Sequence, residues 1–198
     1  GNVVRVAPAA DGMAFTTLDG QKRTLTCRDL LIWDAEKPVG LAGVMGGENS
    51  EMTAKSTEVF LECAVFDPAT IRKTARRLGI PSEASYRFER GVDQVGSAFA
   101  LDRAVSLIQQ TAGGQALAGT ALAEPRPFVT PRLTFRKARA EKLLGVPLTD
   151  AFCRDTLSAL GCALGAQSDD GLAVLPPSHR LDLEREVDLI EEVGRVYG

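Results

Sequence analysis

Residues 59–66 place one carboxylate, Glu62, among apolar side chains that alternate in the manner of a β-strand. Phe60 and Ala64 flank Glu62 on its own side of the expected strand, so its carboxylate should be nearly buried. A buried carboxylate must be paired, hydrogen-bonded or raised in pKa. Two interpretations follow: a structural ion pair with a nearby arginine, or a group placed to accept a hydrogen bond from a ligand.

A second group of carboxylates lies near the end of the chain. Asp188, Glu191 and Glu192 are spaced at i, i+3 and i+4, which puts them on one face of an expected helix. Asp182 comes just before that helix. Such a face is usually solvated, but oxygen ligands of this kind also suit a hard cation such as Mg²⁺. The residues alone leave both interpretations open.

Cations crowd a short segment of the chain. Arg72, Lys73, Arg76 and Arg77 form either an exposed basic helix face or a contact for phosphate. Residues 79–93 follow directly and are polar, aromatic and charge-rich. We expect them to form a long irregular connection, either a solvated loop closed by ion pairs or a functional segment.

The elements that position these groups begin with β structure over residues 3–33. Asp19 and Gly20 lie between two strand-like runs, which predicts a hairpin. Residues 39–47 are apolar and contain four glycines. They form either a bulged core strand ending in a Gly-Gly turn or a place where backbone or ligand comes close.

Helices are predicted in the middle of the chain. Asp67 is expected to cap a helix that ends at Gly79. A second helix is expected over residues 95–111, with one apolar face. Residues 115–131 lack helical periodicity and contain three prolines, so we expect a connector there.

The pattern of the residues after the connector predicts a compact α/β unit. The expected elements are a strand at 133–135, a helix at 137–144, a helix at about 149–160, a hairpin at 162–175 and a final helix after about 183. One side of the final helix is expected to carry Leu183, Val187, Ile190, Gly194 and Tyr197.

The composition is that of a globular chain of one large or two small domains. Of 198 residues, 44% are hydrophobic and 25% charged. A net charge of −3 argues against a protein that binds nucleic acid through its overall charge. No apolar run suits a membrane helix, and no signal-peptide pattern opens the sequence. Cysteine and histidine spacing gives no zinc signature, and Cys63 and Cys153 are expected to be buried thiols in a reducing cytosol.

Several strings, in order and spacing, closely resemble the β subunit of bacterial phenylalanine–tRNA ligase. No single string would be enough to identify the family, but together the strings extend over nearly the whole chain. The strings are Thr17-Leu18-Asp19-Gly20, Leu41-Ala42-Gly43-Val44-Met45-Gly46-Gly47-Glu48, Leu61-Glu62-Cys63-Ala64, Ala75-Arg76-Arg77-Leu78-Gly79, Ser82-Glu83-Ala84-Ser85-Tyr86-Arg87-Phe88-Glu89-Arg90-Gly91-Val92-Asp93, Leu160-Gly161-Cys162 and Asp188-Leu189-Ile190-Glu191-Glu192-Val193-Gly194-Arg195-Val196-Tyr197-Gly198.

This resemblance implies an α+β fold with two domains. Residues 1–120 would be the C-terminal part of a mixed α/β editing domain, called B3/B4, and residues 121–131 a linker. Residues 132–198 would be a small α/β B5 domain of the winged-helix-like, DNA-binding type. The family's β subunit is far longer, so the chain is expected to be an excised piece. It would begin after the family's Leu-His-Ala-Phe-Asp motif and stop before the catalytic-like module.

In the family, the editing pocket hydrolyses tyrosine wrongly attached to tRNA(Phe). Carried over by motif, Glu62 would recognise the tyrosine hydroxyl, and Gly46 would bring backbone close to the substrate. Ser82 and Ala84 would shape the pocket wall. The resemblance implies attack by a positioned water on the aminoacyl ester, with no protein nucleophile and no catalytic residue. It divides residues 79–93 near Ser85: the first half borders the pocket, and the charged half pins the loop.

Four carboxylates match the positions at which the family binds a Mg²⁺ ion shared with the α subunit. These four residues are Asp182, Asp188, Glu191 and Glu192. The resemblance also implies an α2β2 tetramer that uses ATP, acts on tRNA(Phe) in the cytoplasm and does not involve a membrane. Synthesis itself resides in the α subunit. The alternative is a free-standing tRNA-binding or editing-like module without ligase activity, which would not need the acidic C-terminal helix.

Overall fold

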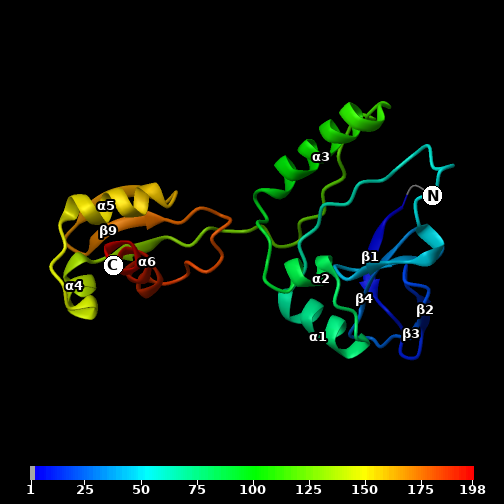
Figure 1. Cartoon of the computed structure of the whole chain (residues 1–198), viewed down its shortest axis with the longest axis horizontal. Helices are drawn as coiled ribbons and strands as arrows, with labels where there is room; N and C mark the ends of the chain where they lie inside the picture. The colour runs from blue at the N-terminus through cyan, green and yellow to red at the C-terminus, as the bar shows by residue number, and fades with distance from the viewer. Residues whose placement is uncertain (1–2) are drawn as a thin grey trace. The chain divides into compact units, whose positions relative to one another are not determined.

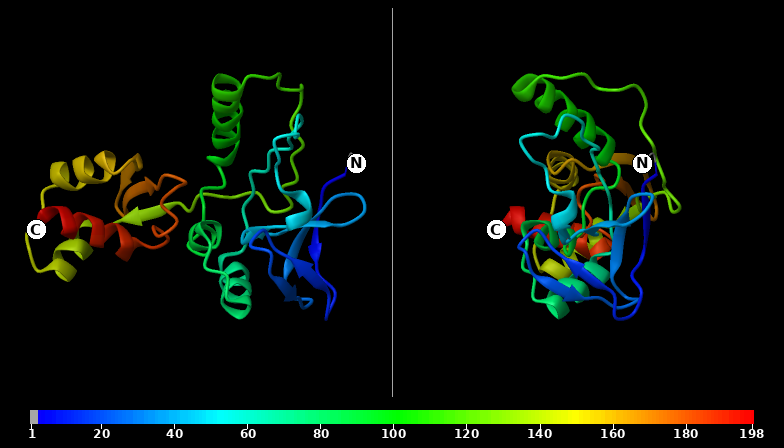
Figure 2. Two further views of the ribbon diagram at one scale, coloured as in Figure 1. Left: turned by 45° about the vertical axis from the view of Figure 1, so that its right-hand side comes forward. Right: turned by 90° about the vertical axis from the view of Figure 1, so that its right-hand side faces the viewer.

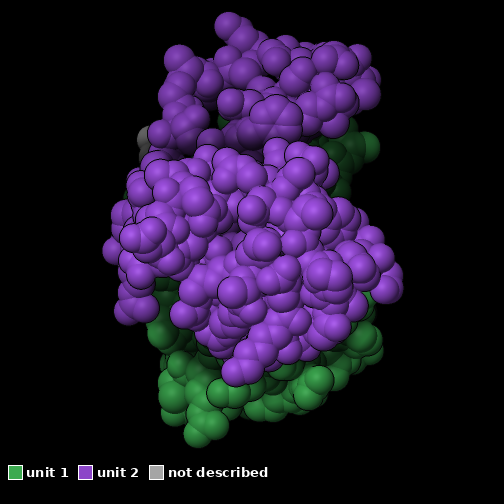
Figure 3. All heavy atoms as spheres, turned by 90° about the vertical axis from the view of Figure 1, so that its left-hand side faces the viewer, with its two compact units in different colours: residues 1–92 green, residues 93–198 purple. Residues whose placement is uncertain are grey.

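The computed structural model describes residues 3–198, whose strands and helices confirm the expected α+β class (Figure 1). The chain divides into two compact units, residues 1–92 and residues 93–198, which Figure 3 distinguishes by colour. Each unit has its own cluster of buried apolar side chains. No helix among the described residues is long and apolar enough to cross a membrane.

The first unit is built on two antiparallel sheets. The four-stranded sheet has the order β1, β4, β5, β6, and β2 pairs with β3 in a separate hairpin. The bounds are β1 (Arg5–Pro8), β2 (Ala14–Thr16), β3 (Lys22–Thr24), β4 (Leu30–Trp33), β5 (Pro38–Leu41) and β6 (Met45–Gly46), followed by a 3-10 turn, η1 (Glu48–Ser50).

The predicted hairpin at Asp19 and Gly20 is confirmed. The hydroxyl of Thr17 donates to Asp19 Oδ1 at 2.5 Å, and the Gly20 N–H donates to the Thr17 carbonyl at 2.8 Å. Gly20 has φ +73°, the left-handed conformation that glycine adopts without strain. The turn therefore sets the register that pairs Ala14 with Thr24.

The glycine-rich residues 39–47 form a tight hairpin, β5 and β6, instead of one bulged strand. Gly43 lies in the connecting turn with φ +65°. A Cβ added there would come within 2.8 Å of side-chain atoms of both Ile71 and Phe66. The need for glycine at this position is therefore explained by close packing against the chain's own apolar core.

The strand predicted over residues 59–66 is wrong. These residues adopt no regular structure and form part of a long irregular connection between η1 and the next helix (Figure 2). Val59, Phe60 and Cys63 are exposed, so the expected burial of the Cys63 thiol is also wrong. Alternating side chains form a strand only beside a partner strand, and none pairs with this segment among residues 3–198.

Two helices complete the first unit and lie side by side in Figures 1 and 2: α1 (Pro68–Leu78) and α2 (Glu83–Phe88). The Asp67 side chain accepts from the Thr70 N–H at 2.7 Å, and Gly79 ends α1 in the left-handed conformation, so both predicted ends are confirmed. Ile71 and Ala75 turn the apolar side of α1 toward the core. The buried core of this unit is Ala9, Phe15, Leu25, Leu31, Leu41, Ala42, Val44, Phe66, Ile71, Ala75 and Ile80.

The second unit begins with α3 (Ser97–Ala112), the helix expected over residues 95–111. None of its residues is buried, and Phe99 is 76% exposed. Residues 113–132 contain no helix or strand, as expected for a connector. The division at Val92 assigns α3 to this unit, and the limits 1–120, 121–131 and 132–198 stay a prediction.

The rest of the second unit matches the predicted elements. Three antiparallel strands have the order β7, β9, β8, and three helices accompany them. The bounds are β7 (Leu133–Phe135), α4 (Lys137–Leu144), α5 (Asp150–Ala159), β8 (Ala163–Ser168), β9 (Gly171–Leu175) and α6 (Glu186–Tyr197). The buried core is Phe135, Ala140, Leu148, Cys153, Leu157, Cys162, Leu172, Val174, Leu183, Leu189, Ile190 and Val193.

The apolar face predicted for the final helix is partly wrong. Val187 and Tyr197 are exposed, whereas Leu189, Ile190 and Val193 form the buried face of α6. The neighbours of α6, which are α5 and β7, lie on that side and decide which residues are covered. The Cys153 thiol is buried as predicted, and Cys162 is buried as well, so desolvation raises the pKa of both thiols.

Candidate functional site

Ser82 begins α2 and ties it to the turn between β5 and β6. Its Oγ accepts a hydrogen bond from the Ser85 N–H at 3.0 Å and donates one to the Val44 carbonyl oxygen at 2.5 Å. Ser85 Oγ in turn accepts from the Ser82 N–H at 3.0 Å, which completes a capping box. An irregular connection was expected over residues 79–93, so the prediction did not include this helix. The Ser-x-x-Ser spacing was the sequence signal that could have revealed it.

Gly46 and Ala84 each lie two positions beyond one partner of that hydrogen bond. Gly46 is in β6, two positions beyond Val44, and its carbonyl accepts the Leu18 N–H at 3.0 Å. A Cβ added to Gly46 would lie 2.9 Å from Leu18 Cδ1. Ala84 is half-buried in the first turn of α2. The structure thus joins the elements that bear Gly46, Ser82 and Ala84, with Leu18 as the group closest to Gly46.

Glu62 is not joined to this group by a hydrogen bond or ion pair within residues 3–198. It lies in the irregular segment before α1, and the residue is exposed. Neighbouring protein atoms nevertheless reduce the hydration of its carboxyl group and raise its pKa. No arginine partner is present among the described residues, so the structural ion pair considered from the sequence is not formed.

The charged half of residues 79–93 makes contacts mainly with other residues of the same segment. The Arg90 guanidinium lies over the Tyr86 ring, 3.6 Å from its centroid, and donates to the Tyr86 carbonyl at 2.7 Å. Arg87 pairs with Glu83 one turn away, where both side chains are exposed. These local contacts agree with a role in holding the shape of the segment.

Some of the basic side chains of α1 bind other groups of the protein, so they do not all form an exposed cationic surface. The Arg77 guanidinium pairs with the carboxylate of Asp29, which is 1% exposed. Asp29 Oδ1 also accepts from the Thr74 hydroxyl at 2.9 Å, so two side chains of α1 hold one buried carboxylate. Arg72 donates to the Glu89 carbonyl at 3.3 Å. Arg77 is therefore used for packing α1 onto the preceding strands.

The four acidic residues near the C-terminus do not converge on one point. Asp182 receives two hydrogen bonds from Arg180, at 2.9 and 2.6 Å. Glu192 is buried and receives one guanidinium on each oxygen, Arg180 at 2.7 Å and Arg195 at 2.5 Å. The hydrogen bonds from these arginines lower the pKa of both carboxyl groups. The sequence expectation of a solvated acidic face is thus wrong for Glu192.

Asp188 and Glu191 complete the set of four. Asp188 Oδ2 accepts the backbone N–H groups of Glu184 and Arg185, at 3.1 and 2.7 Å, and so caps the start of α6. Glu191 is exposed. Within residues 3–198 no group of three or more histidine, cysteine, aspartate or glutamate side chains is arranged to hold a metal ion. As arranged in this chain, the four carboxylates do not fit a Mg²⁺ site, because three of them already bind arginine or backbone N–H groups.

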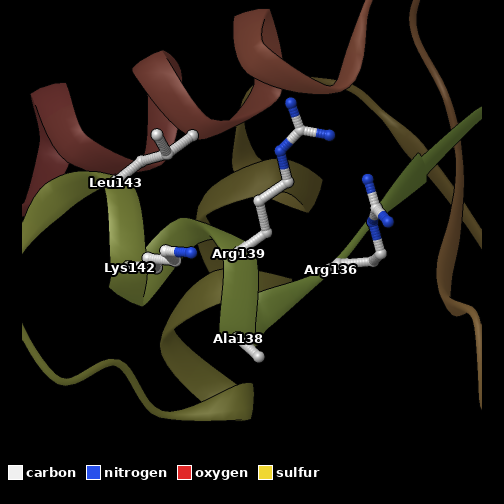
Figure 4. A pocket seen from close by; sticks show the side chains of 5 residues that line it. All are labelled: Arg136, Ala138, Arg139, Lys142 and Leu143. Atoms are coloured by element: carbon white, nitrogen blue, oxygen red, sulfur yellow. The ribbon is translucent and has the colours of Figure 1, made fainter.

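A basic hollow on α4 was missed by the sequence analysis. It measures about 520 Å³ and is lined by Arg136, Ala138, Arg139, Lys142 and Leu143, shown in Figure 4. Both arginines donate to the carboxylate of Glu186 at the start of α6, Arg136 at 2.5 Å and Arg139 at 2.9 Å. The spacing of Arg136, Arg139 and Lys142 was a local signal for the basic residues, but Glu186 lies about 50 positions away in the sequence, so their pairing with it could not be predicted locally.

Comparison with known proteins gives two family matches, in order along the chain. Residues 1–113 match the B3/4 domain, and residues 133–198 match the tRNA synthetase B5 domain. The chain is 60% identical over 193 residues to the phenylalanine–tRNA ligase β subunit of Oleidesulfovibrio alaskensis, covering 98% of this chain and 24% of that protein. The β subunit of Nitratidesulfovibrio vulgaris is 57% identical over 198 residues and that of Geobacter metallireducens 45%; both alignments cover the whole chain and 25% of the relative. The chain spans about a quarter of the length of these relatives.

Proposed function

Since the chain belongs to the family of phenylalanine–tRNA ligase β subunits, whose B3/4 and B5 domains it carries, we propose that it takes part in editing by that enzyme. The proposed contribution is hydrolysis of tyrosine wrongly attached to tRNA(Phe), together with contacts to tRNA and to an α subunit in an α2β2 enzyme. The observation that carries the proposal is the consecutive match to both domains, with 60% identity over 98% of the chain.

The proposed chemistry is hydrolysis of an ester by a positioned water. The water oxygen attacks the ester carbonyl, the bond to the ribose oxygen breaks, and free tyrosine and a tRNA hydroxyl are released. Glu62 accepts the phenol O–H of tyrosine, whereas phenylalanine leaves the carboxylate without that hydrogen bond. Gly46, Ser82 and Ala84 form the wall, supported by the hydrogen bond that holds Ser82 against the β5–β6 turn.

Glu62 requires a change of surroundings to act in this way. In the structure it is exposed, and its pKa is raised only by partial loss of hydration. Discrimination by a hydrogen bond is strong when the polar group is shielded from water. We propose that the irregular segment over residues 59–66 becomes covered when the substrate or further protein is bound.

The whole enzyme is proposed to use ATP and Mg²⁺ and to act in the cytoplasm, as implied by the family. Asp182, Asp188, Glu191 and Glu192 are the proposed positions of a Mg²⁺ site shared with the α subunit. Because this chain does not arrange them as one, the shared site would require ligands or rearrangement from that partner. A free-standing editing-like module remains the alternative, but the match to a B5 domain favours the ligase subunit.

The test is Glu62→Ala in an α2β2 enzyme that contains this sequence. Loss of a hydrogen bond to a charged group should slow hydrolysis of Tyr-tRNA(Phe) by about 10- to 100-fold and bring it closer to that of Phe-tRNA(Phe). Glu58→Ala, which removes an exposed acidic side chain nearby, is the matched control and should leave editing unchanged. If Glu62→Ala still clears Tyr-tRNA(Phe) and spares Phe-tRNA(Phe), the proposed role of Glu62 is wrong.

A further inference from the structure

Arg180 lies between two of the four carboxylates, Asp182 and Glu192. Its guanidinium donates through Nε and Nη2 to both oxygens of Asp182, and Nη2 also donates to Glu192 Oε1 at 2.7 Å. The side chains of Arg180 and Glu192 are 21% and 12% exposed, so their contact is largely shielded from water, whereas the side chain of Asp182 is 62% exposed. Two carboxylates that lie ten positions apart in sequence are thus held by one cation.

Glu192 depends on such a partner because of where α6 places it. It lies beside the buried Leu189 and Val193, and its side chain is 12% exposed. A carboxylate in these surroundings needs a counter-charge and hydrogen bonds. Arg180 supplies them on one oxygen and Arg195 on the other. The pair of arginines therefore accounts for the burial of Glu192 without any metal ion.

The same contacts oppose a divalent cation. Mg²⁺ requires carboxylate oxygens about 2.1 Å away in octahedral directions and keeps several waters. Here a guanidinium already lies along the oxygens of Asp182 and against Oε1 of Glu192. A doubly charged ion at these oxygens would also be repelled by the positive charge of Arg180. The ion could bind only after Arg180 had been displaced.

We propose that Arg180 is a positioning residue that keeps Asp182 and Glu192 in a closed ion-pair network and excludes Mg²⁺ from this chain. The inference rests on the family's proposed use of these carboxylates as metal ligands, but its test does not depend on editing. Removal of the guanidinium exposes oxygens that bind a divalent cation. A partner that displaces Arg180 would have the same effect in an assembled enzyme.

The chain contains a matched control for this proposal. Glu186 is also held by two arginines, Arg136 and Arg139, and its side chain is 13% exposed. It belongs to the same helix but not to the proposed metal ligands. Arg139→Gln therefore removes the same kind of ion pair without opening the Asp182–Glu192 pair.

The experiment is titration of the 198-residue chain with Mn²⁺, a paramagnetic probe for Mg²⁺ sites, followed by electron paramagnetic resonance. We expect Arg180→Gln to bind Mn²⁺ at least tenfold more tightly than the unaltered chain and Arg139→Gln to match the unaltered chain. Adding Asp182→Asn to Arg180→Gln should abolish the gain. Circular dichroism establishes that each variant is folded. A folded Arg180→Gln chain with no gain, or an equal gain in Arg139→Gln, overturns the proposal.

A second measurement needs no change at Arg180 and covers the case in which that variant does not fold. The unaltered chain is melted in MgCl2 and in NaCl of equal ionic strength. We expect the same melting temperature in both salts, because a chain that does not bind Mg²⁺ gains no stability from it. A higher melting temperature in MgCl2 that disappears in Asp182→Asn would contradict the exclusion of Mg²⁺.

Discussion

The hydroxyl of Ser82 donates a hydrogen bond to the main-chain carbonyl of Val44, 38 positions away in sequence. The same oxygen caps α2 by accepting the Ser85 N–H. One side chain therefore connects the start of a six-residue helix to the turn that leads to Gly46. A helix this short has little stability of its own, so its position depends on such tertiary contacts.

Ser82→Ala should lower the free energy of unfolding by about 1–2 kcal/mol, because the cap and the bond to Val44 are lost together. Ser82→Thr keeps a hydroxyl and should lose less than half of that. Urea denaturation measures both. Ser158→Ala, at an exposed helix position, is the control and should change little. A Ser82→Ala variant as stable as the control would show that the bond to Val44 contributes nothing.

Asp29→Asn should destabilise the first unit by about 1–3 kcal/mol, since it removes a buried carboxylate that Arg77 and Thr74 hold. Burial alone would raise the pKa of Asp29, but hydrogen bonds from Arg77, the Thr26 N–H and Thr74 outweigh it and lower that pKa. Glu36→Gln, at an exposed turn, is the control.

The pH dependence of Asp29 follows from the sign of that shift. Because the pKa of Asp29 is lower in the folded state, its carboxylate stabilises the fold at pH values above its unfolded pKa of about 3.9. That stabilisation is lost as the pH falls through the pKa of the folded state. The difference between unaltered chain and Asp29→Asn should thus be constant from pH 7 to about 5 and narrow below about 4. Urea melts across this range measure it; a gap that widens in acid would contradict the assignment.

Gly43→Ala and Gly20→Ala separate two costs of replacing glycine. Both glycines have positive φ, but only at Gly43 would a Cβ meet neighbouring atoms, 2.8 Å from Ile71 and Phe66. Gly20→Ala should cost about 1–2 kcal/mol from backbone strain alone. Gly43→Ala should cost about 1–3 kcal/mol more, from overpacking. Thermal or urea unfolding decides, and equal losses would mean that the core accommodates the extra methyl group.

The 198-residue chain should not activate phenylalanine by itself. By family resemblance, ATP-dependent synthesis resides in the α subunit, and this chain covers about a quarter of its β-subunit relatives. ATP–pyrophosphate exchange with the purified chain measures this; detectable exchange would contradict the prediction. Hydrolysis of Tyr-tRNA(Phe) should be weak for the same chain because Glu62 is exposed in it.

Short-range signals were sufficient for much of the fold. The cap at Asp67, the left-handed glycine at Gly79 and the Asp19-Gly20 hairpin act through residues within five positions, and all three predictions are confirmed. The order of α and β elements in residues 133–197 follows from similar local patterns. Family membership was also recognised from the sequence, because the order and spacing of motifs are properties of the sequence alone.

The environment of the carboxylates was decided only in three dimensions. Alternation predicted that Glu62 is nearly buried, yet no strand among residues 3–198 pairs with its segment, and it is exposed. Helical spacing placed Glu192 on a solvated face, yet it is buried between Arg180 and Arg195. The sequence by itself determined where helices, hairpins and acidic positions occur, because those depend on neighbouring residues. Burial and charge pairing depend on which distant segments pack together, so only the tertiary structure decided them.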